Sequence, residues 1–446
     1  MRRISKFGWL GGLLLLLLGG VARAQLLFPP PEFESGYRMP VTTTPPGRAL
    51  WLQYLDVGVL AACLAVAVWL IYRPRSRRGI FWLSLFSLAY FGFYRKGCIC
   101  PIGSPQNIAY GLLHPSYSVP VTVVAFFALP LIVALFFGRA FCAGVCPQGA
   151  LQDFFLIKPI KVPAFLEHGL GLIPYLFLGA GIAYAATGTG FVICRYDPFV
   201  PIFRLSGSFF LLAAGVSFLL IGMFVGRPYC RFLCPYGALL KLGSLVSRWR
   251  VRVTPETCTQ CRLCEHSCPF GALREPAPPG APAPIPGERR TLGWLLVLLP
   301  VLIIAGALAG RALSPVAARL HPTVALAELY ARQQQHPVVY GVMTPEALAL
   351  ARMAEQPGTV LEAAADLRGR FRLATAIFGA WFGLVVGIKL ILLSLRVSRT
   401  DFEPDPGACF ACARCFSSCP SERVRRGLPV VTVQPPVPAA ASALAK

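Results

Sequence analysis

Cys258-Thr-Gln-Cys261-Arg-Leu-Cys264-Glu-His-Ser-Cys268-Pro269 is the stretch of sequence that decides the fold. Three cysteines have two residues between each and the next, and after three further residues Cys-Pro follows. This is the bacterial ferredoxin run for a [4Fe–4S] cluster. In two-cluster ferredoxins the fourth cysteine of a run binds the other cluster, so a second run is required. The chain contains it as Cys409-Phe-Ala-Cys412-Ala-Arg-Cys415-Phe-Ser-Ser-Cys419-Pro420. The sequence therefore predicts a split bacterial-type 2[4Fe–4S] ferredoxin module.

The two-cluster rule assigns each cluster three ligands from one run and one ligand from the other run. We expect one cluster on Cys258, Cys261, Cys264 and Cys419, and the second on Cys409, Cys412, Cys415 and Cys268. With these ligands neither half can bind its cluster alone. The alternative is a pair of zinc knuckles, but those usually show two pairs of ligands without the Cys-Pro ending.

Composition places this module in a membrane protein. The chain has 446 residues, of which 56% are hydrophobic and 14% charged, and its mean hydropathy is +0.62. Such apolar chains contain several membrane spans. The net charge of +23 then needs no nucleic acid, because cytoplasmic loops of membrane proteins collect Lys and Arg. Eight of the sixteen cysteines lie in the ferredoxin runs, which need reducing surroundings, so we expect the runs to face the cytoplasm.

The N-terminus has the layout of a secretory signal. Arg2, Arg3 and Lys6 precede a Leu-rich stretch, and Ala22-Arg-Ala24 resembles a cleavage site. We expect a signal peptide over 1–24 and a short periplasmic segment over 25–50. An uncleaved anchor is the alternative and gives the same orientation.

About seven transmembrane helices follow, at roughly 20 apolar residues for each span. The predicted spans are 51–71, 80–95, 119–138, 170–187, 208–226, 292–312 and 373–395. The first span ends in Arg73, Arg75, Arg77 and Arg78, as an inward-running span should. Alternation then places 139–169, 227–291 and 396–446 in the cytoplasm. The predicted fold class is an α-helical integral membrane protein of the bacterial inner membrane.

The predicted domains follow from these spans. A five-helix membrane core covers 51–257 and is followed by the first ferredoxin half, 258–275. A Pro-rich linker, 276–291, leads to the sixth helix, 292–312, and then to a periplasmic helical segment, 313–372. The seventh helix, 373–395, precedes the second ferredoxin half, 396–428, and a disordered tail, 429–446.

An internal repeat provides four further cysteines. Gly138-Arg-Ala-Phe-Cys142-Ala-Gly-Val-Cys146-Pro matches Gly226-Arg-Pro-Tyr-Cys230-Arg-Phe-Leu-Cys234-Pro, and each copy follows an inward-running span. A C-x3-C step on a helix puts both sulfurs on one side. Two facing pairs could hold a metal ion or a further cluster. The alternative is that these are small buried residues at a bend.

The remaining cysteines and the histidines carry weaker signals. Cys98-Ile-Cys100-Pro-Ile-Gly103 and Cys194 are predicted on the outer side, where a disulfide competes with a metal or flavin contact. Cys63 lies within the first span as an inert thiol. None of the five histidines lies well inside a span, and C-x2-C-H is absent, so no haem is expected.

These motifs resemble those of the NosR/NapH membrane polyferredoxins over roughly residues 50–428. Three further stretches favour NosR: Tyr196-Asp-Pro-Phe199, His321-Pro-Thr-Val-Ala-Leu-Ala327 and Arg399-Thr-Asp-Phe-Glu-Pro-Asp405. The resemblance implies electron transfer to a periplasmic copper nitrous oxide reductase, or its maintenance, in denitrification. NosR normally carries an N-terminal domain with covalent FMN. About 25 residues lie here between the predicted signal and the first span, so no covalent FMN is expected in this chain, and a separate FMN-domain protein could be a partner.

Alternatives to this function stay open at the level of the sequence. A NapH-like subunit would oxidise quinol for periplasmic nitrate reductase, whereas an assembly or regulatory factor would handle copper or sense redox state. A cytochrome oxidase biogenesis ferredoxin is a further candidate. The donor could be quinol or a soluble cytoplasmic protein. Asp153 and Glu167-His168 could accept quinol protons, although ordinary interfacial roles suit them better. No catalytic residue is expected, because substrate chemistry belongs to a partner.

Overall fold

The computed structural model describes residues 48–97, 101–253, 258, 260–274, 276, 286–335, 357–394 and 402–429. The predicted signal peptide, the tail beyond 429, and Cys98 and Cys100 lie outside these residues. The chain divides into two compact units. One contains Arg48–Ala312 and Leu373–Lys446, and the other contains Leu313–Arg372, which includes helix α17 (Pro322–Gln335).

The fold is mostly helical, and four helices in the described part are long and apolar enough to cross a membrane. They are α2 (Leu50–Tyr72), the joined α8 and α9 (Ala164–Leu170 and Ile173–Ala186), α16 (Pro286–Ala318) and α19 (Pro357–Ser394). Two shorter apolar helices, α5 (Val121–Phe137) and α12 (Phe209–Gly222), match the third and fifth predicted spans. The second predicted span consists of α3 (Arg77–Ser87) and the π-helical η1 (Leu88–Tyr94). The count of seven spans stays a prediction.

Short helices connect these spans. They are α4 (Ser104–Leu113), α6 (Ala140–Gly144), α7 (Pro147–Phe154), α10 (Val192–Arg195), α11 (Val200–Arg204), α13 (Pro228–Phe232) and α14 (Pro235–Leu245). Both copies of the internal repeat fold alike: a five-residue helix ends just before the second cysteine, and the following proline begins the next helix. Proline suits the first helical position because its fixed φ is helical and its missing N–H would be unbonded there.

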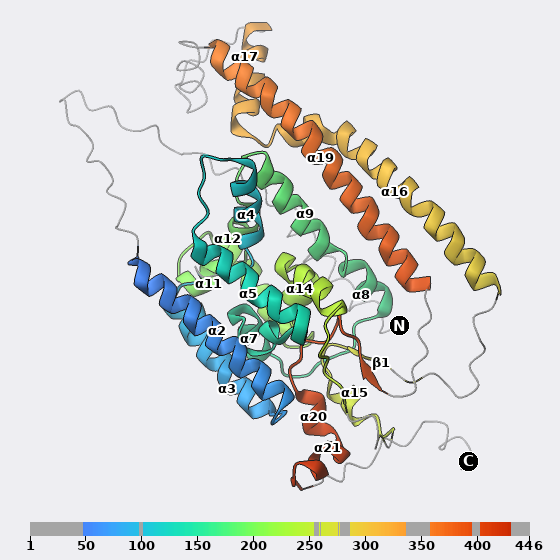
Figure 1. The fold of residues 1–446 in the computed structure, drawn as a ribbon. Helices are drawn as coiled ribbons and strands as arrows, with labels where there is room; N and C mark the ends of the chain where they lie inside the picture. Colours follow the sequence, from blue (N-terminus) through green and yellow to red (C-terminus); the bar gives the residue numbers. More distant parts are fainter. Residues whose placement is uncertain are drawn as a thin grey trace, which may run out of the picture. The chain divides into compact units, whose positions relative to one another are not determined.

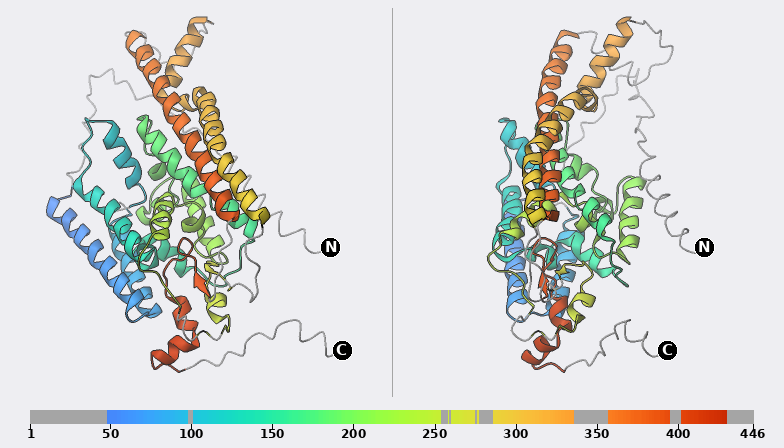
Figure 2. Two further views of the ribbon diagram at one scale, coloured as in Figure 1. Left: turned by 45° about the vertical axis from the view of Figure 1, so that its right-hand side comes forward. Right: turned by 90° about the vertical axis from the view of Figure 1, so that its right-hand side faces the viewer.

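The two ferredoxin halves come together although about 140 residues separate them in the sequence. Strand β1 (Leu273–Arg274) pairs antiparallel with β2 (Glu403–Pro404). Helix α15 (Leu263–Ser267) packs on α20 (Arg414–Ser418), which is followed by α21 (Pro420–Arg425). The two segments lie side by side in all the views of Figures 1 and 2. The expected meeting of the two halves is therefore present in the structure.

One hydrophobic core runs from the membrane helices into the ferredoxin halves. It contains Leu60 and Leu64 of α2 together with Phe270 and Phe410 of the two cysteine runs. The backbone is held to this core as well, since the Ser244 hydroxyl donates to the carbonyl of Pro406 at 2.9 Å. The module is thus built onto the membrane core.

Helices α16 and α19 run side by side and touch through glycines (Figure 2). A Cβ atom at Gly379 would meet the carbonyl oxygen of Gly306, and one at Gly383 would meet that of Leu302. Small residues allow such close backbone contact between membrane helices, where van der Waals packing is the main driving force.

We predict that Gly379→Val lowers the thermal unfolding temperature of the detergent-solubilised protein. Overpacking of this kind costs about 1–3 kcal/mol. Gly293→Val on α16 is the matched control, because a Cβ there meets nothing within 4 Å. Equal unfolding temperatures for the two variants would refute the glycine contact.

Candidate iron–sulfur and thiol sites

The first cysteine run shares its site with one cysteine of the second run. Cys258, Cys261, Cys264 and Cys419 line one small cavity, closed by the side chain of Phe402. Burial raises the pKa of Cys264 to about 11, and the charge of Cys419 is the next largest contribution to that increase. The structure thus brings together the four cysteines that the crossed arrangement assigns to one cluster.

Cys268 lies with the second run. Burial raises the pKa of Cys409 to about 12, and the charges of Cys412 and Cys268 add to the increase. Burial likewise raises the pKa of Cys415, with further contributions from Cys409, Cys412 and Cys268. Thiols that are hard to ionise in the empty protein release protons when they bind a metal. The second predicted set of four is therefore also grouped.

The backbones of the two runs match in detail. The residues before and after the central cysteine are left-handed in both runs: Gln260 and Arg262 have φ of 52° and 58°, and Ala411 and Ala413 have 52° and 61°. Side chains other than glycine rarely adopt this conformation. Alternation of right- and left-handed residues turns successive N–H groups inward and forms a nest for an anionic group, iron–sulfur sites included. Both runs therefore fit a cluster by their backbone shape.

Among the described residues, no three His, Cys, Asp or Glu side chains converge closely enough to hold one ion. The four thiolate ligands of a [4Fe–4S] cubane lie farther apart than the ligands of a single ion. The features of this structure that fit a cubane are the paired cysteine runs and their backbone nests.

The four cysteines of the internal repeat lie in the same buried core. Cys142, Cys146, Cys230 and Cys234 are each 7–8% exposed. Burial raises the pKa of Cys234, with added contributions from Cys230 and Cys146. The four repeat cysteines thus share one buried core, while their facing arrangement and what they bind stay predictions.

Two glutamines hold cysteines in the same way. The Gln152 side chain donates to Cys230 Sγ at 3.2 Å and accepts from the N–H of Tyr229 at 3.0 Å. The Gln106 side chain donates to Cys194 Sγ at 3.0 Å and accepts from the N–H of Ile193, also at 3.0 Å. Cys194 is exposed, whereas Cys230 is buried. Sequence reasoning missed both glutamines, although each follows a Cys-Pro-x-Gly by three residues.

The arginine of each repeat copy reaches the ferredoxin halves. Arg139 lies 3.9 Å from the ring centre of Phe410 and donates to the carbonyl of Gly407 at 3.1 Å. Arg227 lies 5.6 Å from Phe410 and 5.7 Å from Phe270, and it donates to the carbonyl of Cys142. The two phenylalanine rings lie 4.7 Å apart. The repeat thiols and the ferredoxin cysteines are thus joined by a continuous, buried set of contacts.

Asp153 binds three arginines from three parts of the chain. It pairs with Arg77, with Arg227 at 3.6 Å and with Arg414 at 3.1 Å. Burial alone would raise the pKa of Asp153, but the three guanidiniums lower it well below its usual value. Its stabilising effect is therefore complete above the ordinary carboxyl pKa of about 4 and is lost only as the pH falls through the lower folded value. Asp153 remains ionised and is unsuited to accept a quinol proton.

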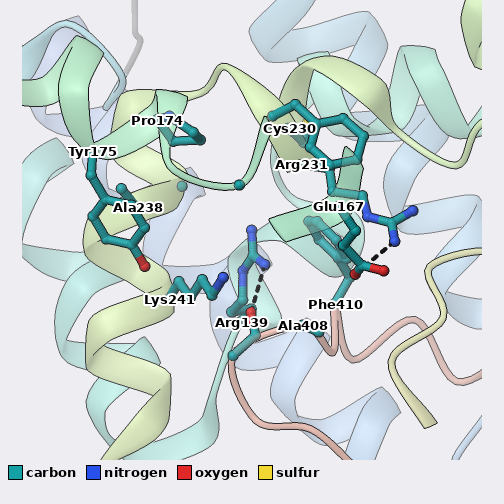
Figure 3. Close-up of a pocket in the computed structure, with 14 residues that line it drawn as sticks. Arg139, Glu167, Pro174, Tyr175, Cys230, Arg231, Ala238, Lys241, Ala408 and Phe410 are labelled. Atoms are coloured by element: carbon teal, nitrogen blue, oxygen red, sulfur yellow. Dashed lines mark hydrogen bonds and ion pairs between the residues drawn. The ribbon is translucent and has the colours of Figure 1, made fainter. Parts of the chain in front are cut away.

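Figure 3 shows a second charged site beside Cys230. Glu167 accepts from Arg231 at 2.8 Å, so this carboxylate has a structural partner. Burial, together with the positive charge of Arg139, lowers the pKa of Lys241 to about 8. Three basic side chains, Arg139, Arg231 and Lys241, thus lie in the pocket that Cys230 lines.

Comparison with known proteins agrees with this arrangement. Two models, both described as "4Fe-4S binding domain", match the chain, one at residues 119–159 and 207–254 and one at 251–274. The first model includes both C-x3-C-P pairs, and the second includes the first ferredoxin run.

Several curated proteins are similar to part of the chain. YccM of Escherichia coli (strain K12) is 27% identical over 38% of this chain and 52% of its own. NirI of Paracoccus denitrificans is 26% identical over 51% of this chain and 37% of its own. The regulatory protein NosR of Pseudomonas aeruginosa is 25% identical over 51% and 36%. The chain thus matches about half or less of the length of these relatives. No solved structure matches.

We predict that Asp153→Asn destabilises the docked ferredoxin half and lowers the iron retained on purification. Removing one partner from a buried charge network costs about 3–5 kcal/mol, because buried Arg227 loses its counter-charge. The measurement is thermal unfolding together with iron analysis.

Asp366→Asn is the control for this variant. Asp366 forms an exposed pair with Arg370 at 2.9 Å, and surface pairs contribute only about 0–1 kcal/mol. If Asp153→Asn behaved like this control, the anchoring role of Asp153 would be wrong.

Proposed function

We propose that the chain is a 4Fe–4S membrane ferredoxin of the NosR/NapH type, which relays electrons from a quinol or cytoplasmic donor to a periplasmic reductase system. Nitrous oxide reductase is the acceptor that we favour. The proposal locates the chain in the bacterial inner membrane, with the ferredoxin module on the cytoplasmic side and 313–372 on the periplasmic side.

The observation that carries this proposal is the grouping of Cys419 with Cys258, Cys261 and Cys264 in one cavity. We assign these four cysteines to one cluster, and Cys409, Cys412, Cys415 and Cys268 to the other. A [4Fe–4S] cluster supplies one-electron chemistry when bound. The protein residues hold the thiols, exclude water and provide positive charge.

The contacts between the module and the membrane core support a relay. Phe270 and Phe410 fill the space between the ferredoxin cysteines and the repeat, and both are 2% exposed. Arg139 and Arg227 bridge the rings to the repeat backbone, where Cys142 and Cys230 lie. Close packing of these buried side chains shortens the separation between redox groups. We propose that the repeat thiols hold a further redox centre on this path.

The crossed assignment of ligands predicts that a substitution in the first cysteine run alters the cluster built mainly on the second run. Cys268→Ser should remove or alter the cluster built mainly on Cys409, Cys412 and Cys415, while the cluster at Cys258 persists. Electron paramagnetic resonance of the reduced protein, with iron analysis, measures this. Cys63→Ser is the matched control, because Cys63 is buried in α2 and belongs to neither run. Loss of only the cluster at Cys258 would refute the crossed assignment.

The proposed function is tested by measuring whether the reduced protein delivers electrons to nitrous oxide reductase. Reduced protein, mixed anaerobically with nitrous oxide reductase and nitrous oxide, should regain the visible absorbance of its oxidised clusters, and omission of the substrate should abolish this. An assembly or regulatory factor would instead bind copper stoichiometrically without substrate-dependent reoxidation. A NapH-like subunit would be reoxidised by the periplasmic nitrate reductase system and nitrate. Either of these results would contradict the favoured acceptor.

A further inference from the structure

A cavity lies where the described ends of several membrane-core elements meet. The residues that line it come from the start of α2, the end of η1, the starts of α4 and α5, and the segment 192–204. Its volume is about 370 Å³. Ligand pockets in proteins begin at about 300 Å³, so the space suits a small organic molecule.

Three arginines line this cavity: Arg48, Arg95 and Arg204. The two acidic residues in its wall, Asp56 and Asp197, are buried and have protein partners. Asp56 accepts from the Tyr90 hydroxyl at 2.8 Å and pairs with Arg95 at 3.1 Å. Gln148 donates to the carboxylate of Asp197 at 2.7 Å. Asp56 also pairs with Arg48 at 3.5 Å. The three guanidiniums outnumber the two carboxylates, so the cavity wall has an excess of positive charge.

Two of the arginines have buried donors that no described residue accepts from. The Nε atoms of Arg48 and Arg95 are buried and have no hydrogen-bond partner in the described part of the chain. Buried donors in native proteins are nearly always bonded, so each orphaned donor needs an explanation. Guanidinium groups bind carboxylate and phosphate oxygens through paired N–H donors. Arg48 and Arg95 line the cavity, so an oxyanion there would lie beside their guanidinium groups.

The rest of the wall suits the body of an organic molecule. Phe126, Ile193 and Val200 provide apolar surface, while Asn107 and Thr122 provide polar groups. The exposed thiol of Cys194 also lies in this wall, oriented by its hydrogen bond from Gln106. A bound molecule would therefore lie against Cys194 and shield it.

We propose that this cavity binds a small organic anion that carries a carboxylate or phosphate group. The arginines bind the oxyanion, and the apolar wall receives the organic body. This inference is independent of the proposed electron transfer, since it uses none of the cluster cysteines.

The test is the rate at which N-ethylmaleimide modifies Cys194 in the purified full-length protein, followed by peptide mass spectrometry. Benzoate and phenyl phosphate are the two anionic probes, and neutral benzamide at matched ionic strength is the control compound. At a probe concentration of about ten times its dissociation constant, the rate should fall about tenfold by mass action. Benzamide should leave the rate unchanged. Protection by benzoate or by phenyl phosphate alone would identify which oxyanion the site prefers.

Arg204→Gln should abolish the protection, because it removes one guanidinium from the wall. Arg204 is exposed, so the fold should persist, and buried Cys63 reports any unfolding by becoming modified. Arg195→Gln is the matched control on the same segment, since Arg195 does not line the cavity, and it should keep full protection. Unsaturable protection, equal protection by benzamide, or unchanged protection in Arg204→Gln would overturn the proposal.

Discussion

The buried guanidinium of Arg227 is the group on which the rest of the structure depends. Its side chain has no exposed surface, and a charge removed from water must be compensated within the protein. The compensation comes from the carbonyls of Cys142 and Ala143 and from the carboxylate of Asp153. Because Asp153 also binds Arg414 of the second ferredoxin half, one charge network joins the repeat to the module.

This charge network holds the second ferredoxin half against the membrane core, although helices α16, α17 and α19 separate it in the sequence from the first half. Arg75 pairs with Glu422 at 2.8 Å, and Arg77 pairs with Asp153. The arginines after α2, which we expect to mark its cytoplasmic end, thus also bind the module. A topological signal in the sequence therefore has a second, structural use, because arginine provides several donors from one charged group.

The sequence predicted the features that depend on spacing. The cysteine runs, the repeat and the main apolar spans follow local periodicity, and the structure groups the cysteines as the two-cluster rule requires. It could not predict Asp153 as an anchor, because that role depends on three arginines from distant segments. The roles of Gln106 and Gln152 were also missed, although their matched positions after Cys-Pro were visible as a repeat. The cavity beside Cys194 combines residues whose proximity no local pattern reveals.

The central claim is that two distant cysteine runs form one module with two clusters. The most direct measurement is electron paramagnetic resonance of the anaerobically purified, dithionite-reduced protein, with iron and sulfide analysis of the same sample. Two clusters in the module predict at least about eight iron and about eight sulfide per chain and a spectrum broadened by magnetic interaction between two neighbouring clusters. A spectrum of a single isolated cluster with about half that iron would contradict the claim.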